Sequence, residues 1–277
     1  QGEGQRDDDD ENRPLNFSWR STFPPANPLD NGTFWTPDST AAEASVEIGW
    51  AKRYGVYPGD RITIAVGEQE REFTVMAAER PPMVYDYSGF PEHTYHVQYP
   101  APGLPALAEQ VRQLIQSAGF SALLDAQRGF DHGSFAPLVV MYPLADVPVV
   151  QLSLRAGYDP AEHLAVGRAL APLREQGVLI VGSGLSYHNL RRMGPSAAVP
   201  SKQFDDWLQQ TLVTTEPHQR AQRLIDWQDA PAAHVAHPQE DHLLPLMVAV
   251  GAAGDDPGER FLLEHALEVD MGSYRFG

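Results

Sequence analysis

Hydrophobic and polar residues recur with different periods along the chain, and these periods predict the secondary structure. Leu104 to Ala118 carries apolar residues three and four positions apart, which is typical of an amphipathic helix, and Gly119 follows where a C-terminal cap is favoured. Glu72 to Ala77 alternates in a way that indicates a half-buried strand. The nearly continuous apolar runs Pro148 to Leu154 and Val178 to Val181 are typical of strands buried on both faces.

Helix-start signals follow the first of these apolar runs. Asp159, Pro160 and Glu162 provide an N-cap, a proline in the first turn and a capping-box glutamate, which predict a helix to about Gln176. Further helices are expected over roughly residues 201–213, 217–228 and 239–253. The order strand, helix, strand predicts an α/β fold, in which a mostly parallel central sheet carries helices on both faces.

The beginning of the chain has a different character. Residues 1–13 are strongly acidic and almost without apolar residues, so we expect an acidic disordered tail. Residues 14–72 are rich in Pro, Asn, Gly and aromatic residues, which indicates an atypical β-rich segment that includes a strand at Arg61 to Val66. Residues 73–277 form the predicted α/β domain.

Charge and composition exclude several kinds of partner and site. The formal net charge is −17, and the only lysines are Lys52 and Lys202, so we expect no grip on nucleic acid or on an anionic membrane. Because the chain has no cysteine, a metal would be held by histidines and carboxylates. No apolar run reaches the roughly 18 residues that a membrane-spanning helix needs. We therefore expect a cytoplasmic protein with no membrane partner.

Three histidines lie where functional side chains are expected. His188 follows the predicted strand Val178 to Val181, and ligands collect at the carboxyl ends of parallel strands. His242 follows Asp241 on a predicted helix, and His132 opens a helix-like stretch. A neutral imidazole can bind iron(II) or zinc(II), or can act as a general acid or base, although each histidine alone also suits a hydrogen-bonded structural role. Surface or helix-face positions are expected for His93, His96, His163, His218 and His265.

About three quarters of the chain, from residue 73 to residue 277, resembles the class III extradiol ring-cleavage dioxygenases, in the branch similar to DOPA 4,5-dioxygenase. The matching segments, in chain order, are residues 85–91, 99–103, 131–143, 149–153, 182–190, 204–207, 242–246 and 274–277. The resemblance implies a mononuclear non-haem Fe(II) or Zn(II) site that binds a small aromatic diol of the catechol type and inserts both atoms of O2 beside the diol. It also implies that His188 and His242 are metal ligands and that His132 is the catalytic acid/base.

The chain departs from that family in its first part. The family motifs His-Gly-Ser-Pro and Ala-His-Trp, each of which supplies a metal-binding histidine at the end of a strand, are absent, and no histidine precedes His93. Residues 14–70 instead resemble the extracytoplasmic domain of an ABC-transporter permease. Because a catalytic metal normally takes three protein ligands, further ligands are expected from His93, His96, Asp86 or the acidic tail.

These observations leave more than one interpretation. The first is an extradiol dioxygenase with replaced ligands, and the second is a catalytically inactive fused or rearranged α/β module that serves for binding or structure. A third, hydrolysis by a pair formed by Ser134 and His132, has no motif in its support. Loss of two family strands would also leave a sheet edge unpaired, which predicts a homodimer formed across that edge.

Overall fold

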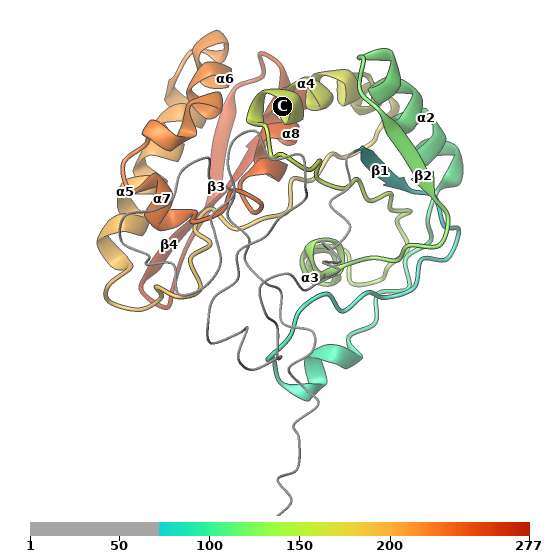
Figure 1. Cartoon of the computed structure of the whole chain (residues 1–277), viewed down its shortest axis with the longest axis horizontal. Helices are drawn as coiled ribbons and strands as arrows, with labels where there is room; N and C mark the ends of the chain where they lie inside the picture. The colour runs from blue at the N-terminus through green and yellow to red at the C-terminus, as the bar shows by residue number, and fades with distance from the viewer. Residues whose placement is uncertain (1–71) are drawn as a thin grey trace, which may run out of the picture. The chain divides into compact units, whose positions relative to one another are not determined.

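A computed structural model of the chain describes residues 72–277 (Figure 1). The predicted acidic tail, the permease-like segment and the strand at residues 61–66 lie outside the described residues. The described strands are β1 (Phe73–Met76), β2 (Ala122–Asp125), β3 (Gly258–Ala266) and β4 (Val269–Phe276). The α-helices are α2 (Pro105–Ser117), α3 (His132–Met141), α4 (Pro160–Leu170), α5 (Ala198–Gln209), α6 (Pro217–Ile225), α7 (Ala233–Ala236) and α8 (Leu244–Ala253).

The first two strands form a small parallel sheet, with Phe73 opposite Ala122 and Met76 opposite Asp125. Helix α2 connects them and packs on both, which is the crossover that a parallel pair requires. Its buried side chains, Ala108, Val111 and Ile115, recur at helical spacing. They share a core with β1, β2 and α4, so the predicted helix stripe and the predicted strand at residues 72–77 are both confirmed.

The predicted strands at residues 148–154 and 178–181 differ from the structure. Both segments are outside the named strands, and they are partly exposed instead of buried on both faces, with Leu179 and Val181 62% and 43% exposed. The first segment meets β1 antiparallel, through the single bridge between Val75 and Leu152. Within residues 72–277, the parallel sheet therefore consists of β1 and β2 alone. The described part of the chain is a mixed arrangement of helices and sheets in which the parallel sheet is small.

The helix at Asp159 begins as its sequence predicts. The Asp159 carboxylate accepts hydrogen bonds from the backbone N–H groups of Ala161 and Glu162, at 2.7 and 3.4 Å, and α4 continues as a 3-10 helix to Gln176. His163 lies on this helix, but its side chain faces the core and is 0% exposed, so the prediction of a surface position is wrong.

The remaining helices are close to their predicted positions, apart from their ends. Helix α5 starts before the predicted residue 201 and continues into a π-helical turn, Gln210–Thr214, while α6 is followed by a short 3-10 helix, Trp227–Asp229. Helix α8 starts only at Leu244, so the predicted start near residue 239 is wrong. His242 consequently lies on the turn before the helix.

Strands β3 and β4 form an antiparallel hairpin that the sequence analysis did not predict. Its turn residues, Leu267 and Glu268, both have positive φ, which gives the twist that a two-residue hairpin turn needs. The hairpin packs against α5, and in Figure 1 it lies beside the helices of the C-terminal half. Its buried Val269 belongs to the large core formed with α5, α6 and α8.

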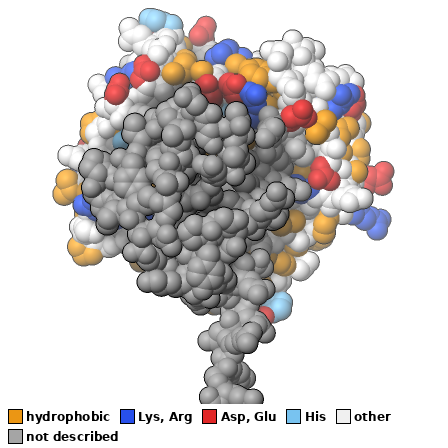
Figure 2. All heavy atoms as spheres, in the orientation of Figure 1, with side chains coloured by type: hydrophobic (Ala, Val, Ile, Leu, Met, Phe, Trp, Pro, Cys, Tyr) orange, Lys and Arg blue, Asp and Glu red, His pale blue; other side chains and the backbone are white. Residues whose placement is uncertain are grey.

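On the face drawn in Figure 2, Lys and Arg side chains stand apart from one another among acidic and apolar ones. Of the helices in the described part of the chain, none combines the length and apolar character needed to cross a membrane.

Candidate functional site

The loop that follows residues 178–181 carries His188 and is held by the segment before α8. The His188 backbone N–H donates to the Ala236 carbonyl at 2.9 Å, and the Asn189 side-chain amide donates to the Val235 carbonyl at 2.8 Å. The first hydrogen bond fixes the backbone of His188, and the second attaches the side chain of the next residue to the same segment. The backbone that carries the imidazole is therefore anchored, although His188 lies on a loop.

His237 is hydrogen-bonded to the same loop. This residue was not singled out from the sequence. Its Nε2–H donates to the Ser186 carbonyl at 3.1 Å, while Phe204 and Trp227 pack edge-on against its ring. Burial lowers the pKa of His237 to about 4, so the ring is neutral at pH 7. Only its place shortly before His242 in the sequence gave any signal for this role.

His242 lies where the His188 loop passes close to the turn before α8. The Leu185 N–H lies 3.4 Å from His242 Nδ1, and a Cβ on Gly184 would stand 2.1 Å from the His242 carbonyl oxygen. Residue 184 must therefore be glycine for the two backbones to approach. This contact explains the Gly182 to Gly184 stretch, which is a loop packed on α8.

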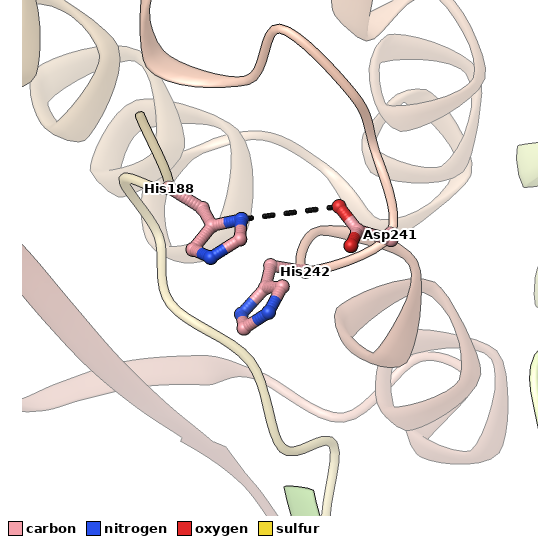
Figure 3. A group of neighbouring side chains, drawn as sticks. All are labelled: His188, Asp241 and His242. Carbon is pink, nitrogen blue, oxygen red and sulfur yellow. Dashed lines mark ion pairs between the residues drawn. The ribbon is translucent and has the colours of Figure 1, made fainter. Parts of the chain in front are cut away.

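Three side chains converge between these two segments (Figure 3). His188, Asp241 and His242 each offer one ligand atom, and these atoms lie within 4.8 Å of one another. His188 Nδ1 is 3.9 Å from Asp241 Oδ1, which is buried and accepts no hydrogen bond. The two imidazole rings are stacked, with centroids 3.4 Å apart and planes 15° apart.

Both imidazoles favour the neutral form that can bind a metal. Burial is the largest cause that lowers the pKa of His188, and Asp241 opposes the shift. For His242, burial followed by repulsion from His188 lowers the pKa to about 4. Two neutral imidazoles beside a carboxylate are the donor set of the mononuclear iron(II) sites that bind through two histidines and one acid.

His132 approaches this group from a third segment. It is the first residue of α3, and its ring centroid is 6.1 Å from that of His242. The structure therefore brings together all three histidines that the sequence singled out. Asp86 bonds to His132 Nδ1 at 2.8 Å, and this carboxylate is thereby engaged away from the His188, Asp241 and His242 group.

Other residues considered from the sequence are placed elsewhere. His93 and His96 are exposed, and neither belongs to the group of ligand atoms found among residues 72–277. The acidic tail lies outside the described residues. Ser134 donates its hydroxyl to Gln151 Oε1 at 2.5 Å, an engagement that does not favour its pairing with His132 as a nucleophile.

Asp241 is the further functional candidate that sequence reasoning did not select. Its position directly before His242 was a signal, because adjacent side chains on a tight turn can point to one site. The sequence alone does not show that this turn precedes α8, and on a helix neighbouring side chains would diverge by about 100°.

Comparisons with known proteins identify the family of this chain. Residues 63–271 match the family model described as the catalytic LigB subunit of aromatic ring-opening dioxygenase. A protein named 4,5-DOPA dioxygenase extradiol from Portulaca grandiflora is 39% identical over 221 residues, which cover 75% of this chain and 78% of that protein. A protein of the same name from Beta vulgaris is 34% identical, over 86% of this chain and 90% of its own length.

A solved structure is also similar. An uncharacterized protein from Escherichia coli K12 superposes with a TM-score of 0.62 at 33% identity, covering 75% of this chain and 81% of that one. These relatives give no support to the permease resemblance of residues 14–70, since the family match already begins at residue 63. The chain belongs to the LigB family of extradiol aromatic ring-opening dioxygenases, and so to the dioxygenase oxidoreductases.

Proposed function

We propose that this protein cleaves a catechol-type aromatic ring beside its two hydroxyl groups, with both atoms of O2 entering the product. The observation that carries the proposal is the convergence of His188, Asp241 and His242, with His132 beside them. Both plant relatives are named as DOPA dioxygenases, so DOPA is the first substrate to test. The substrate class is thus a small aromatic diol.

The donor set fits a divalent metal held by His188 and His242, with Asp241 in the place of a third ligand. The Asp241 oxygen that accepts no hydrogen bond is the main support, because a buried carboxylate oxygen without a partner is costly and a cation would satisfy it. The planes of the two stacked rings are only 15° apart, so their in-plane lone pairs lie in nearly parallel planes, and one ring would have to rotate about its side-chain torsions for both to bind the same metal.

Of the two metals considered, iron(II) suits the reaction better than zinc(II). Iron(II), when bound, supplies the one-electron chemistry that activates O2, whereas zinc(II) has no redox chemistry of its own. The protein contributes the orientation of the diol, and His132 contributes proton transfer. We propose that His132 accepts a proton from a substrate hydroxyl group and later returns it, as a general base and acid.

Metal reconstitution tests this function. Protein stripped with a chelator and reloaded with iron(II) without air should bind about one iron per chain, and should consume O2 and DOPA in equal amounts to give a coloured ring-cleaved product. His188→Ala and His242→Ala should lose both iron and turnover. His218→Ala is the matched control, because His218 is exposed and outside the group.

The opposite result would favour the second interpretation. If the reloaded wild-type protein neither retains iron nor forms product with a range of catechols, the chain is better explained as an inactive α/β module. Stoichiometric iron that disappears in His188→Ala would count against such a module.

A further inference from the structure

Asp86 lies on a backbone segment that is held in a fixed position beside His132. The segment before Asp86 is locked to the segment before His132, since the Phe130 N–H donates to the Pro82 carbonyl and the Val84 N–H donates to the Phe130 carbonyl, both at 2.8 Å. A Cβ on residue 129 would stand 1.9 Å from the Pro82 carbonyl oxygen, so this close pairing requires Gly129. Asp86 therefore reaches His132 from a fixed position.

The Asp86 carboxylate grips both the side chain and the main chain of His132. Its two oxygens lie 2.8 and 2.9 Å from His132 Nδ1, and Oδ1 also accepts the His132 backbone N–H at 3.1 Å. The ring of Tyr87 stands edge-on to the imidazole, with centroids 5.9 Å apart. Together these contacts restrict rotation of the imidazole about both of its side-chain torsions.

These contacts decide which ring nitrogen of His132 carries the hydrogen. A carboxylate only accepts hydrogen bonds, so Nδ1 must carry the hydrogen when the ring is neutral. Nε2 then carries the lone pair, and it has no hydrogen-bond partner among residues 72–277. A neutral histidine without such a partner is free to place its hydrogen on either nitrogen.

We propose that Asp86 is a positioning residue that holds His132 in the Nδ1–H form and directs the basic Nε2 toward the substrate. This role rests on the proposed function, in which His132 accepts a proton from the diol. The proton leaves the substrate hydroxyl oxygen and binds Nε2, and the Asp86 carboxylate stabilises the imidazolium ion that results. In this role Asp86 acts through His132, to which its carboxylate is hydrogen-bonded.

The hydrogen position can be measured without any catalysis. Long-range proton–nitrogen NMR spectra of the full chain, prepared without iron and with nitrogen-15 in its histidines, distinguish the two neutral forms. His132 is assigned from the signal that disappears in His132→Gln. Wild-type protein should show the Nδ1–H form, and Asp86→Ala should shift the population toward Nε2–H. A wild-type ring in the Nε2–H form, or a ring that Asp86→Ala leaves unchanged, would overturn the proposal.

A second variant guards against misfolding. Asp86→Asn keeps the shape of the side chain but can present its NH2 group to Nδ1, so a mixture of the two ring forms is expected. Glu92→Gln is the matched control, because Glu92 pairs with His96 in the same part of the chain, at 3.1 Å and exposed. That control should leave the His132 signals unchanged.

Kinetics provide the complementary readout. Asp86→Ala should lower kcat about 10- to 100-fold, the usual loss when a residue that orients a functional histidine is removed, with little change in KM. Asp86→Glu should restore part of the rate. An unchanged kcat in Asp86→Ala would also overturn the role. If the wild-type protein has no turnover but shows the expected NMR shifts, the proposed function fails while the role of Asp86 in positioning His132 stands.

Discussion

Asp241 differs from the other carboxylates around the site in having one buried oxygen without a hydrogen bond. Asp86 is bonded to His132, and Asp131 accepts a hydrogen bond from Gln151 at 2.6 Å. Among the described acidic residues near the three histidines, Asp241 is thus the one with a buried oxygen that a bound cation would satisfy. Its role as a ligand is a proposal that can be tested by binding alone.

Asp241→Asn should weaken metal binding by more than about 100-fold. Losing a ligand costs more than losing an outer hydrogen-bond partner, which typically costs about 10- to 100-fold. Competition between the protein and a coloured chelator for iron(II) or cobalt(II) measures the affinity. Glu240→Gln removes the same charge from the neighbouring residue and should bind as wild type does. Equal affinity in the two variants would exclude Asp241 as a ligand.

Residue types and their order revealed part of this site from sequence. His132, His188 and His242 stood out through their segments, and the structure brings them together. The partners were not visible in the same way, because Asp86 precedes His132 by 46 positions and their contact depends on how two loops are paired. Contacts of this kind follow from the tertiary fold and not from local spacing.

Elements with their own local signals were predicted best. The ends of α2 and the N-cap of α4 depend on neighbouring residues, so they could be recognised. The extended segments at residues 148–154 and 178–181 were predicted as buried strands because their sequences are apolar, but an apolar run does not specify which strand it pairs with. The hairpin of β3 and β4 was missed, since the run Phe261 to Leu263 does not alternate and is exposed on both faces around a bulge.

His163 on α4 contacts the start of its own helix, the loop before it and strand β1, and its protonation at low pH would weaken these contacts. Its Nδ1–H donates to the Asp159 carbonyl at 2.7 Å, its Nε2 accepts the Arg155 backbone N–H at 3.2 Å, and its ring packs on Phe73. Burial is the main cause that lowers the pKa of His163 below 6.5. A proton on Nε2 would replace the acceptor that the Arg155 N–H needs.

The sign of the resulting pH effect is defined. Below pH 6.5 the unfolded chain binds a proton at His163 that the folded chain does not, so the free energy of unfolding falls as the pH decreases toward the folded pKa. The contribution of this group is up to about 1.4 kcal/mol per pH unit. In urea unfolding, the stability advantage of wild type over His163→Asn should shrink between pH 7.5 and 5.5. His218→Asn, at an exposed position, should follow wild type, and a constant gap for His163→Asn would contradict the expectation.

The small parallel sheet has consequences at the scale of the whole molecule. Among residues 72–277, β2 pairs only with β1, and its Leu123 and Leu124 are 56% and 40% exposed. Neighbouring strand residues point to opposite faces, so both faces of this edge strand are apolar. Edge strands of this kind are sites of pairing with another chain.

We therefore expect a homodimer that forms through β2. Light scattering coupled to gel filtration should give twice the mass of one chain, and Leu123→Lys should shift the protein to the monomer, because a charged residue on an edge strand opposes pairing. Leu267→Lys is the control, since Leu267 is 71% exposed on the turn between β3 and β4. A wild-type monomer at micromolar concentration would refute the dimer.

The hairpin of β3 and β4 reaches the loop that bears His188. The Gly272 N–H donates to the Ser186 hydroxyl at 3.0 Å, and the Asp270 N–H donates to the Ser201 hydroxyl at 3.2 Å. Any purification tag or protease cut that disturbs β4 therefore also disturbs its hydrogen bond to the Ser186 side chain, two residues from His188. For laboratory work on this protein, an affinity handle belongs at the opposite end of the sequence, and mass spectrometry should verify that β4 is intact before an inactive sample is interpreted.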